Sequence, residues 1–244
     1  GSGTIHGIRT RQEVSAIETS TATSDSAAVL AQARAYNEAL AGWDPGVEVL
    51  PYEEQLDFDG GAMGWIEVPS VGIELPIYHG TSDEVLAAGA GHVEGTSLPV
   101  GGTSANCVLA AHSGALTQMF DGLRNVSPGD VICLHVAGED LWYTVRSLDV
   151  VQAGESSRLA VEPGADKLTL ITCTSAPNAL MPYGGIGIND QRLLVTAYAS
   201  DAPQAEVHSR SGFADWRVLV LLMALASVLV YGFVLFLFLI SEFQ

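Results

Sequence analysis

Three residues that can act together in nucleophilic catalysis stand at the ends of β-type apolar runs. Cys173 ends the run TLITC, His112 ends VLAAH, and Arg192 opens RLLVTAYA. A thiol at a strand end beside an imidazole can be held as the thiolate that attacks a carbonyl carbon. A guanidinium can donate charge-assisted hydrogen bonds to the oxygen that becomes negative. A lone histidine or arginine is more often structural, but the three types together predict a catalytic site at the rim of a β-structure.

The other two cysteines have a different setting. Cys107 and Cys133 lie within the apolar runs NCVLAAH and DVICLHV, where cysteine usually serves as a small buried hydrophobic residue. An odd number of cysteines excludes a disulfide framework, and no CxxC pair is present to hold a structural zinc. No HExxH or comparable ligand spacing connects the histidines, so we predict no catalytic metal and no cofactor; those considered are His79, His92, His112 and His135. Charge alone leaves a surface Ca²⁺ site open.

The elements that must position these residues are mainly short strands. From Met63 onward, β-type runs alternate with turn residues, which indicates seven or eight strands in an antiparallel or mixed barrel or sandwich. The runs are WIEV, IELPIY, NCVLAAH, DVICLHV, LWYTVRSLDVV, KLTLIT and RLLVTAYA. Short helices are predicted at about 83–88 and 116–123. Before the strands, Val29, Ala33, Tyr36 and Leu40 have helical spacing, and Gly42 follows as a C-cap.

Composition divides the chain into an acidic part and an apolar part. The net charge is −18 although 48% of the residues are hydrophobic. Residues 218–240 carry no charged side chain and would span about 35 Å as a helix, so we predict a transmembrane helix there. The acidic remainder, with lysine only at Lys167, disfavours nucleic-acid binding. The opening Gly-Ser-Gly resembles a cloning remnant, which leaves open whether a native signal peptide or N-terminal anchor has been removed.

The same residues resemble a known family. Thr169-Leu170-Ile171-Thr172-Cys173, followed by Arg192-Leu193-Leu194-Val195 and preceded by His112, looks like the signature of sortases. Residues 64–102 and the Tyr36-Asn37 helix are similar to class C, pilus-assembling sortases of Gram-positive bacteria. This resemblance covers roughly residues 26–199 and implies a closed eight-stranded β-barrel with short helices.

It also implies a membrane-anchored transpeptidase on the extracellular face of the cell membrane. Its substrates would be pilin or surface proteins with an LPXTG-like sorting signal, and the acceptor would be a pilin lysine. By resemblance, Cys173 is the nucleophile, His112 is the acid that protonates the leaving amine, and Arg192 binds the substrate carbonyl. The alternatives left open are a housekeeping sortase that attaches proteins to peptidoglycan, a hydrolytic cysteine peptidase, and a catalytically silent β-domain that binds a surface partner.

Three features depart from the family pattern. The histidine lies in Ala111-His112-Ser113-Gly114, where class C sortases usually have Gly-His-Arg-Gly. The expected lid is Trp43-Asp44-Pro45, but Gly46 stands where an aromatic residue is usual, so Trp43 either substitutes for that ring or simply packs beside the helix end. Residues 174–191 separate the cysteine from the arginine by about twice the expected length, which predicts a functional or mobile loop.

These observations give a predicted domain order. A flexible N-terminal segment occupies 1–25, the helix and lid segment 26–62, and the catalytic barrel 63–199. A polar stalk at 200–217 then leads to the transmembrane helix at 218–240.

Overall fold

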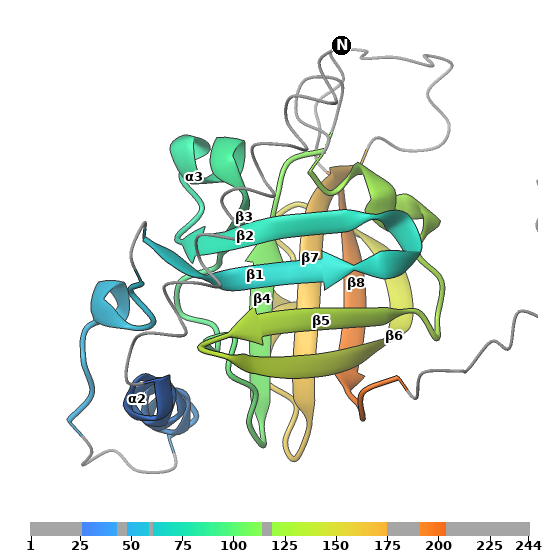
Figure 1. Cartoon of the computed structure of the whole chain (residues 1–244). Coiled ribbons are helices and arrows are strands. Elements are labelled where there is room, and N and C mark those ends of the chain that lie inside the picture. Colours follow the sequence, from blue (N-terminus) through green and yellow to red (C-terminus); the bar gives the residue numbers. More distant parts are fainter. Residues whose placement is uncertain (1–25, 43–47, 59–60, 114–118, 175–190, 204–244) are drawn as a thin grey trace, which may run out of the picture. The chain divides into compact units, whose positions relative to one another are not determined.

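A closed β-barrel forms the centre of the protein (Figure 1). The computed structural model describes residues 26–42, 48–58, 61–113, 119–174 and 191–203. Within these residues, eight strands follow one another around the barrel in the order β1-β2-β3-β4-β7-β8-β6-β5, and β5 pairs with β1 to close it. The strands are β1 (Ala62–Val68), β2 (Ile73–His79), β3 (Ala90–His92), β4 (Ala105–Ala110), β5 (Val131–Val136), β6 (Glu139–Gln152), β7 (Asp166–Thr174) and β8 (Gln191–Ala199).

The sheet is mixed, because two of its ladders are parallel. Strand β2 runs parallel to β3, and β4 runs parallel to β7, while the other neighbours are antiparallel. Figure 1 shows β1, β2 and β5 crossing in front of β4, β7 and β8. The predicted mainly β barrel is therefore confirmed, with one strand that the pattern did not reveal. That strand, β3, has only three residues, too few to show an alternation of its own.

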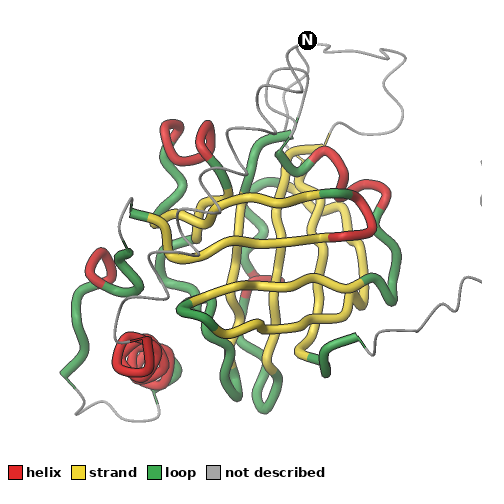
Figure 2. Tube along the Cα trace, viewed as in Figure 1, coloured by secondary structure: helices red, strands yellow, loops and turns green. Residues whose placement is uncertain are grey.

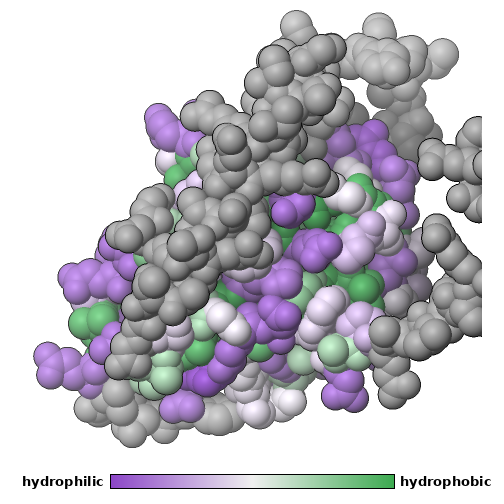
Figure 3. Space-filling view, in the orientation of Figure 1, coloured by the Kyte–Doolittle hydropathy of each residue, from purple (hydrophilic) through white to green (hydrophobic). Residues whose placement is uncertain are grey.

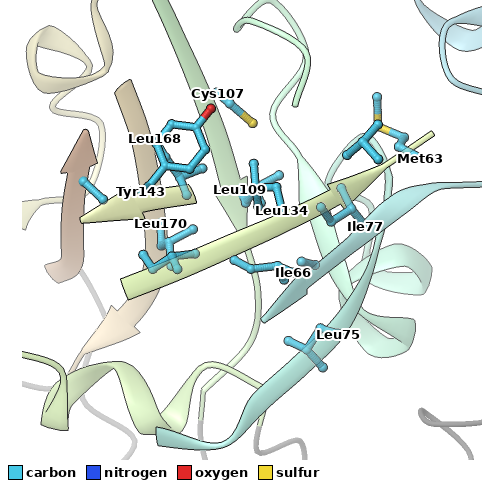
Figure 4. Packing of buried hydrophobic residues seen from close by; sticks show 14 of the residues in the cluster. Met63, Ile66, Leu75, Ile77, Cys107, Leu109, Leu134, Tyr143, Leu168 and Leu170 are labelled. Atoms are coloured by element: carbon cyan, nitrogen blue, oxygen red, sulfur yellow. The ribbon is translucent and has the colours of Figure 1, made fainter. Parts of the chain in front are cut away.

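Alternation along each strand separates a packed interior from an outer face. In β5, Ile132, Leu134 and Val136 belong to the core, while Cys133 and His135 occupy the intervening positions. Figure 4 shows side chains from β1, β2, β4, β5, β6 and β7 meeting inside the barrel. Since successive strand residues point to opposite sides, the core positions also fix which residues face outward.

Short helices lie outside the barrel wall (Figure 2). Helix α3 (Asp83–Ala88) confirms the prediction at 83–88, and the Ser82 hydroxyl caps it by accepting a hydrogen bond from the Val85 amide. The prediction at 116–123 falls partly on residues 114–118, which lie outside the described residues. Its remaining part is a 3₁₀ turn, η3 (Asp121–Asn125). Other 3₁₀ turns are η1 (Tyr52–Glu54), η2 (Pro69–Val71) and η4 (Ser157–Leu159).

Helix α2 (Ser26–Leu40) precedes the barrel and packs against it through a polar anchor. The buried Asn37 amide donates to the carbonyls of Leu98 and Gly101 at 3.1 and 3.3 Å, and its oxygen accepts from the Leu98 amide at 2.7 Å. The helix is confirmed, but its most buried side is Leu30–Ala33–Asn37, and Leu40 is exposed. Gly42 has φ +75°, the left-handed conformation expected after a helix end.

Several predictions fall on residues outside the described ranges. These are the flexible segment 1–25, the lid residues Trp43, Asp44 and Pro45, and the helix at 218–240. Among the described helices, none has both the length and the apolar character needed to cross a membrane.

Candidate active site

The three predicted catalytic residues belong to three neighbouring strands or their direct continuations. Strand β7 pairs with β8 on one side and with β4 on the other. Cys173 and Arg192 are register partners in the antiparallel β7–β8 ladder. Directly opposed residues in such a ladder have Cβ atoms about 5 Å apart. The register therefore brings together two residues that are distant in sequence.

His112 approaches the same place from β4. The parallel ladder pairs Ala110 with Ile171, and the chain continues beside β7 after the strand ends. The Ala111 amide donates to the Ile171 carbonyl at 3.2 Å, and the Thr172 hydroxyl donates to the Ala111 carbonyl at 3.0 Å. His112 is the next residue, at the level of Cys173 on the neighbouring strand.

Strand alternation places His112 and Arg192 on the outer face of the barrel wall. The core residues that define this alternation are Cys107, Leu109 and Ala111 along the β4 segment, and Leu193, Val195 and Ala197 in β8. Because side chains reverse direction at each residue, His112 and Arg192 face outward. The backbone register of β7 with β4 and β8 puts Cys173 between them.

The backbone around His112 is fixed at both ends of a loop. The His112 carbonyl accepts a hydrogen bond from the Phe120 amide at 2.9 Å, and the Phe120 side chain is fully buried in the core. The His112 side chain is half-buried. The hydrogen bond fixes the backbone of His112, and its half-buried side chain keeps part of its surface exposed, as proton transfer requires.

Arg192 is half-buried at the start of β8. Its Nη1 donates to the Gln191 carbonyl at 3.0 Å, which orients the guanidinium relative to its own strand. The ladder continues one step past Cys173, because Thr174 pairs with Gln191. The two ends of the predicted 174–191 loop are therefore paired strand residues, and 175–190 lie outside the described residues, as do Trp43, Asp44 and Pro45.

Tyr52 and His92 form a buried pair that sequence reasoning missed. The Tyr52 hydroxyl is 3.0 Å from His92 Nδ1, and His92 Nε2 is 2.9 Å from the Ser97 carbonyl. Burial lowers the pKa of His92 to about 4, and burial is also the main reason that the pKa of Tyr52 rises to about 12. Since Nε2 donates to a carbonyl, neutral Nδ1 accepts from the tyrosine. The pair anchors the chain at η1, shortly after the predicted lid.

His79 provides a second anchor for this segment. Its Nε2 lies 2.7 Å from the Gln55 carbonyl, and its ring meets Tyr52 edge-on with centroids 5.1 Å apart. No periodicity or motif in the sequence links these residues, because their contacts join segments that are more than 20 positions apart.

The two non-catalytic cysteines have unlike surroundings. Cys107 is buried in the barrel core, as predicted, and burial raises the pKa of its thiol. Cys133 is also buried, but it lies on the outer side of β5 beside His135, and burial followed by the nearby Asp140 and Glu67 raises its pKa to about 12. Among the described residues, Cys133, His135 and Asp140 are a group whose donor atoms all lie within 4.8 Å of one another. The predicted burial of Cys133 is therefore confirmed, but its thiol lies beside polar groups that the sequence did not reveal.

Comparison with known proteins relates this arrangement to one family. The family model described as Sortase domain matches residues 66–200, which include β4, β7 and β8 in full. The chain is 30% identical over 117 residues to Sortase A of Streptococcus agalactiae, covering 46% of this chain and 47% of that protein. The curated relatives that it matches are covered over 47% to 64% of their length.

Solved structures resemble the chain over a larger share. Clostridium perfringens sortase C with the C-terminal cell wall sorting motif has a TM-score of 0.66 and 33% identity, covering 78% of this chain and 99% of that chain. Sortase C-1 of Actinomyces oris has a TM-score of 0.62 and 38% identity, covering 72% and 98%. The described barrel is thus similar to that of class C sortases.

Proposed function

The chain belongs to the sortase family, and we propose that it is a class C type cysteine transpeptidase. Its substrate is a pilin or surface protein with an LPXTG-like sorting signal, and its acceptor is the side-chain amine of a pilin lysine. One of its structural neighbours, from Clostridium perfringens, was solved with a C-terminal cell wall sorting motif, which supports this substrate class.

In the first half-reaction, the Cys173 thiolate attacks the carbonyl carbon of the signal's threonine. Arg192 donates charge-assisted hydrogen bonds to the carbonyl oxygen as negative charge develops there. His112 gives its proton to the departing amine, because an amine leaves poorly as an anion. The peptide bond breaks, and the acyl group remains on Cys173 as a thioester.

In the second half-reaction, the lysine amine attacks the thioester carbon. His112, now neutral, takes a proton from the amine as the new carbon–nitrogen bond forms. The Cys173 thiolate leaves and an isopeptide bond joins the two proteins. The enzyme returns to its starting protonation state, so the cycle requires no cofactor or net redox change.

The observation that best supports these roles is the strand register at β4, β7 and β8. Cys173 and Arg192 are paired residues, and His112 follows the strand on the other side of β7. His112 and Arg192 occupy outward positions of the barrel wall, and the register puts the backbone of Cys173 between them. A site of this kind holds its donors in place before the substrate arrives, which is how oxyanion stabilisation gains its effect.

The test is to incubate the chain with a sorting-signal peptide and a candidate pilin, then search for an isopeptide product by mass spectrometry. Cys173→Ala should form neither thioester nor product. Cys107→Ala is the matched control, because it changes a core thiol that lies outside the proposed mechanism. Thioester formation by the Cys173→Ala variant would overturn the assignment of the nucleophile.

The chain itself is a poor acceptor, which simplifies that experiment. Its one lysine, Lys167, is buried, and its ammonium donates to the carbonyls of Arg158 and Ala160 at 3.3 and 2.8 Å. Burial lowers the pKa of Lys167, which favours the nucleophilic neutral amine. However, its hydrogen bonds to the two carbonyls hold the amine away from bulk solvent. An isopeptide product should therefore carry the lysine of the added pilin, and the mass spectrum identifies it.

Membrane attachment is the second part of the proposal. Residues 218–240 form the transmembrane helix, 200–217 form the stalk, and the barrel at 63–199 lies on the extracellular face of the cell membrane. The apolar, uncharged character of 218–240 supports this arrangement. Removing these residues should release the protein from the membrane fraction of cells that express it, and a variant that stays in that fraction would contradict the anchor.

Product analysis also separates the alternatives. A housekeeping sortase would join the signal to peptidoglycan amines and leave pilin unmodified, whereas a hydrolytic peptidase would release the free acid in the presence of either acceptor. Both share the thioester with the proposed reaction and differ in the attacking group. The likeness to class C structures favours transfer to pilin.

A further inference from the structure

A second cluster of reactive side chains lies on the outer face of β1, β5 and β6. Cys133 and His135 are two residues apart in β5, so they share that face. In the β5–β6 ladder, His135 is paired with Asp140, and in the β1–β5 ladder Cys133 is paired with Glu67. These strands differ from those that carry His112, Cys173 and Arg192.

The donor atoms of the cluster converge. His135 Nδ1 lies 2.7 Å from Asp140 Oδ1 and 3.9 Å from Cys133 Sγ. In a tetrahedral zinc site, bond lengths of about 2.0–2.3 Å put neighbouring ligand atoms roughly 3.3–3.6 Å apart. The two separations from His135 Nδ1 lie about 0.6 Å or less from that range, and all three donor atoms lie within 4.8 Å of one another. The exposed Asp140 side chain can adjust without disturbing the barrel.

The second imidazole nitrogen lies near a carboxylate, which is the kind of group that metal-bound histidines use as a partner. His135 Nε2 is buried and makes no hydrogen bond within the described residues, but it lies 3.6 Å from Glu67 Oε2. A metal-binding histidine commonly donates its other N–H to a carboxylate, which fixes the ring and strengthens the ligand. Trp65 stacks on the imidazole with centroids 4.5 Å apart and an interplanar angle of 13°, which limits rotation of the ring.

The surroundings attract cations. A pocket of about 400 Å³ opens beside His135 and Asp140, and its lining also includes Trp65, Glu67, Glu74 and Glu139, while Cys133 is buried beneath them. Figure 3, drawn from the side of β1 and β5, shows many hydrophilic residues over this part of the barrel. Arg34 pairs with Glu139, while Glu67 and Asp140 lie beside the imidazole of His135.

We propose that Cys133, His135 and Asp140 bind a divalent ion of the zinc type, with Glu67 as a positioning residue. A thiolate, an imidazole and one carboxylate favour zinc over Ca²⁺ or Mg²⁺, which prefer sets of oxygen ligands. Three protein ligands leave a fourth position for water. Binding releases the proton of the buried thiol and replaces it with the metal, so affinity should rise with pH.

The test uses the full chain with Cys173→Ala, so that Cys133 is the thiol available outside the core. After chelator treatment, titration with Zn²⁺ followed by calorimetry should show one ion per chain. Co²⁺ in place of Zn²⁺ should produce a thiolate-to-metal absorption band in the near ultraviolet. This readout is independent of transpeptidation, so it stands whether or not the proposed function does.

Variants assign the ligands. Cys133→Ser should abolish the band, and Asp140→Asn should weaken Zn²⁺ affinity at least about tenfold. Glu67→Gln should weaken affinity by about tenfold while keeping the band, because it acts through His135. Glu139→Gln is the matched control, since it lies in the same pocket beside Asp140 and should change affinity less than about threefold.

Folding is checked separately, by circular dichroism of each variant. Asp140 has 59% of its side chain exposed, so Asp140→Asn keeps the proposal testable even if the buried Cys133→Ser variant fails to fold. A band that survives in folded Cys133→Ser, or the absence of one-to-one Zn²⁺ binding, would overturn the proposal. In that case His135 is a cross-strand hydrogen-bond partner of Asp140 and nothing more.

Discussion

Lowering the pH should destabilise the folded protein through a single buried histidine. His92 has no exposed surface, and both of its ring nitrogens already have partners suited to the neutral form. Nε2 donates to the Ser97 carbonyl, and Nδ1 accepts from the Tyr52 hydroxyl, which itself accepts from the Gly80 amide. Protonating Nδ1 would remove the acceptor of the tyrosine hydrogen bond and add a buried charge.

The size of the effect follows from the pKa. Burial lowers the pKa of His92 from 6.5 to about 4. Since the folded-state value lies below the unfolded-state value, the contribution to stability is complete above pH 6.5 and is lost as the pH falls toward 4. The whole interval corresponds to roughly 3 kcal/mol, of which about 2 kcal/mol disappears between pH 7.5 and pH 5.

The assay is urea unfolding at pH 7.5, 6 and 5, followed by tryptophan fluorescence, for wild type and His92→Gln. Glutamine does not titrate in this range, while the many carboxylates titrate alike in both proteins. The free energy of unfolding of wild type should therefore fall by about 2 kcal/mol more than that of the variant between pH 7.5 and pH 5. An equal fall in the two proteins would refute the argument that His92 is held neutral.

Four other substitutions test the residues around the proposed site. Asn37→Ala should lower the free energy of unfolding by about 1–3 kcal/mol in urea titration, because it leaves buried groups of Leu98 without partners; an unchanged midpoint would contradict the anchoring role. Arg192→Lys should lower kcat/KM for peptide cleavage about 100-fold or more, since an ammonium cannot reproduce the planar guanidinium, and a near-normal rate would remove Arg192 from the oxyanion role. Asp44→Ala and Trp43→Ala should raise the rate at which a small alkylating reagent labels Cys173, and equal rates in all three proteins would mean that the predicted lid does not cover the thiol.

The barrel was largely predictable because its strands are long enough to show an alternation. Seven apolar runs correspond to seven of the eight described strands, and their turn residues separate them clearly. Strand β3 escaped because three residues that are all buried carry no period of two. The parallel pairing of β3 with β2 depends on the turn and helix α3 that connect them. The three residues of β3 alone do not predict this pairing.

Helix α2 shows how tertiary contacts override a local pattern. The apolar spacing of Val29, Ala33, Tyr36 and Leu40 predicted the buried stripe. Ala33 is buried and Val29 and Tyr36 pack against the core, but Leu40 is 43% exposed and the polar Asn37 is buried. An amide that satisfies three backbone groups at once can replace apolar contact on a helix face. The role of Asn37 depends on the loop around Leu98, which lies 61 residues further along the chain and cannot be placed from the helix sequence.

The Cys133 cluster was missed because a turn creates it. Ala137 and Gly138 have φ values of +51° and +82° and join β5 to β6 as a two-residue hairpin, which brings Asp140 opposite His135. The apolar run DVICLHV predicts that the strand is buried, but it does not show that Cys133 and His135 share the outer face. A short Gly-containing turn followed by Glu139 and Asp140 was the available signal, and combining it with strand alternation would have paired the histidine with the aspartate.

Several hydrogen bonds and strand pairs hold the segments around the proposed site. His112 is tied to Phe120, Cys173 and Thr174 are paired with β8, and Asn37 and Tyr52 hold the segments on either side of the predicted lid. Each tie is a backbone or buried hydrogen bond, so altering it costs folding free energy. Substitution of Asn37 or Tyr52 should therefore lower the free energy of unfolding, while the backbone ladder that joins Cys173 to Arg192 does not depend on either side chain.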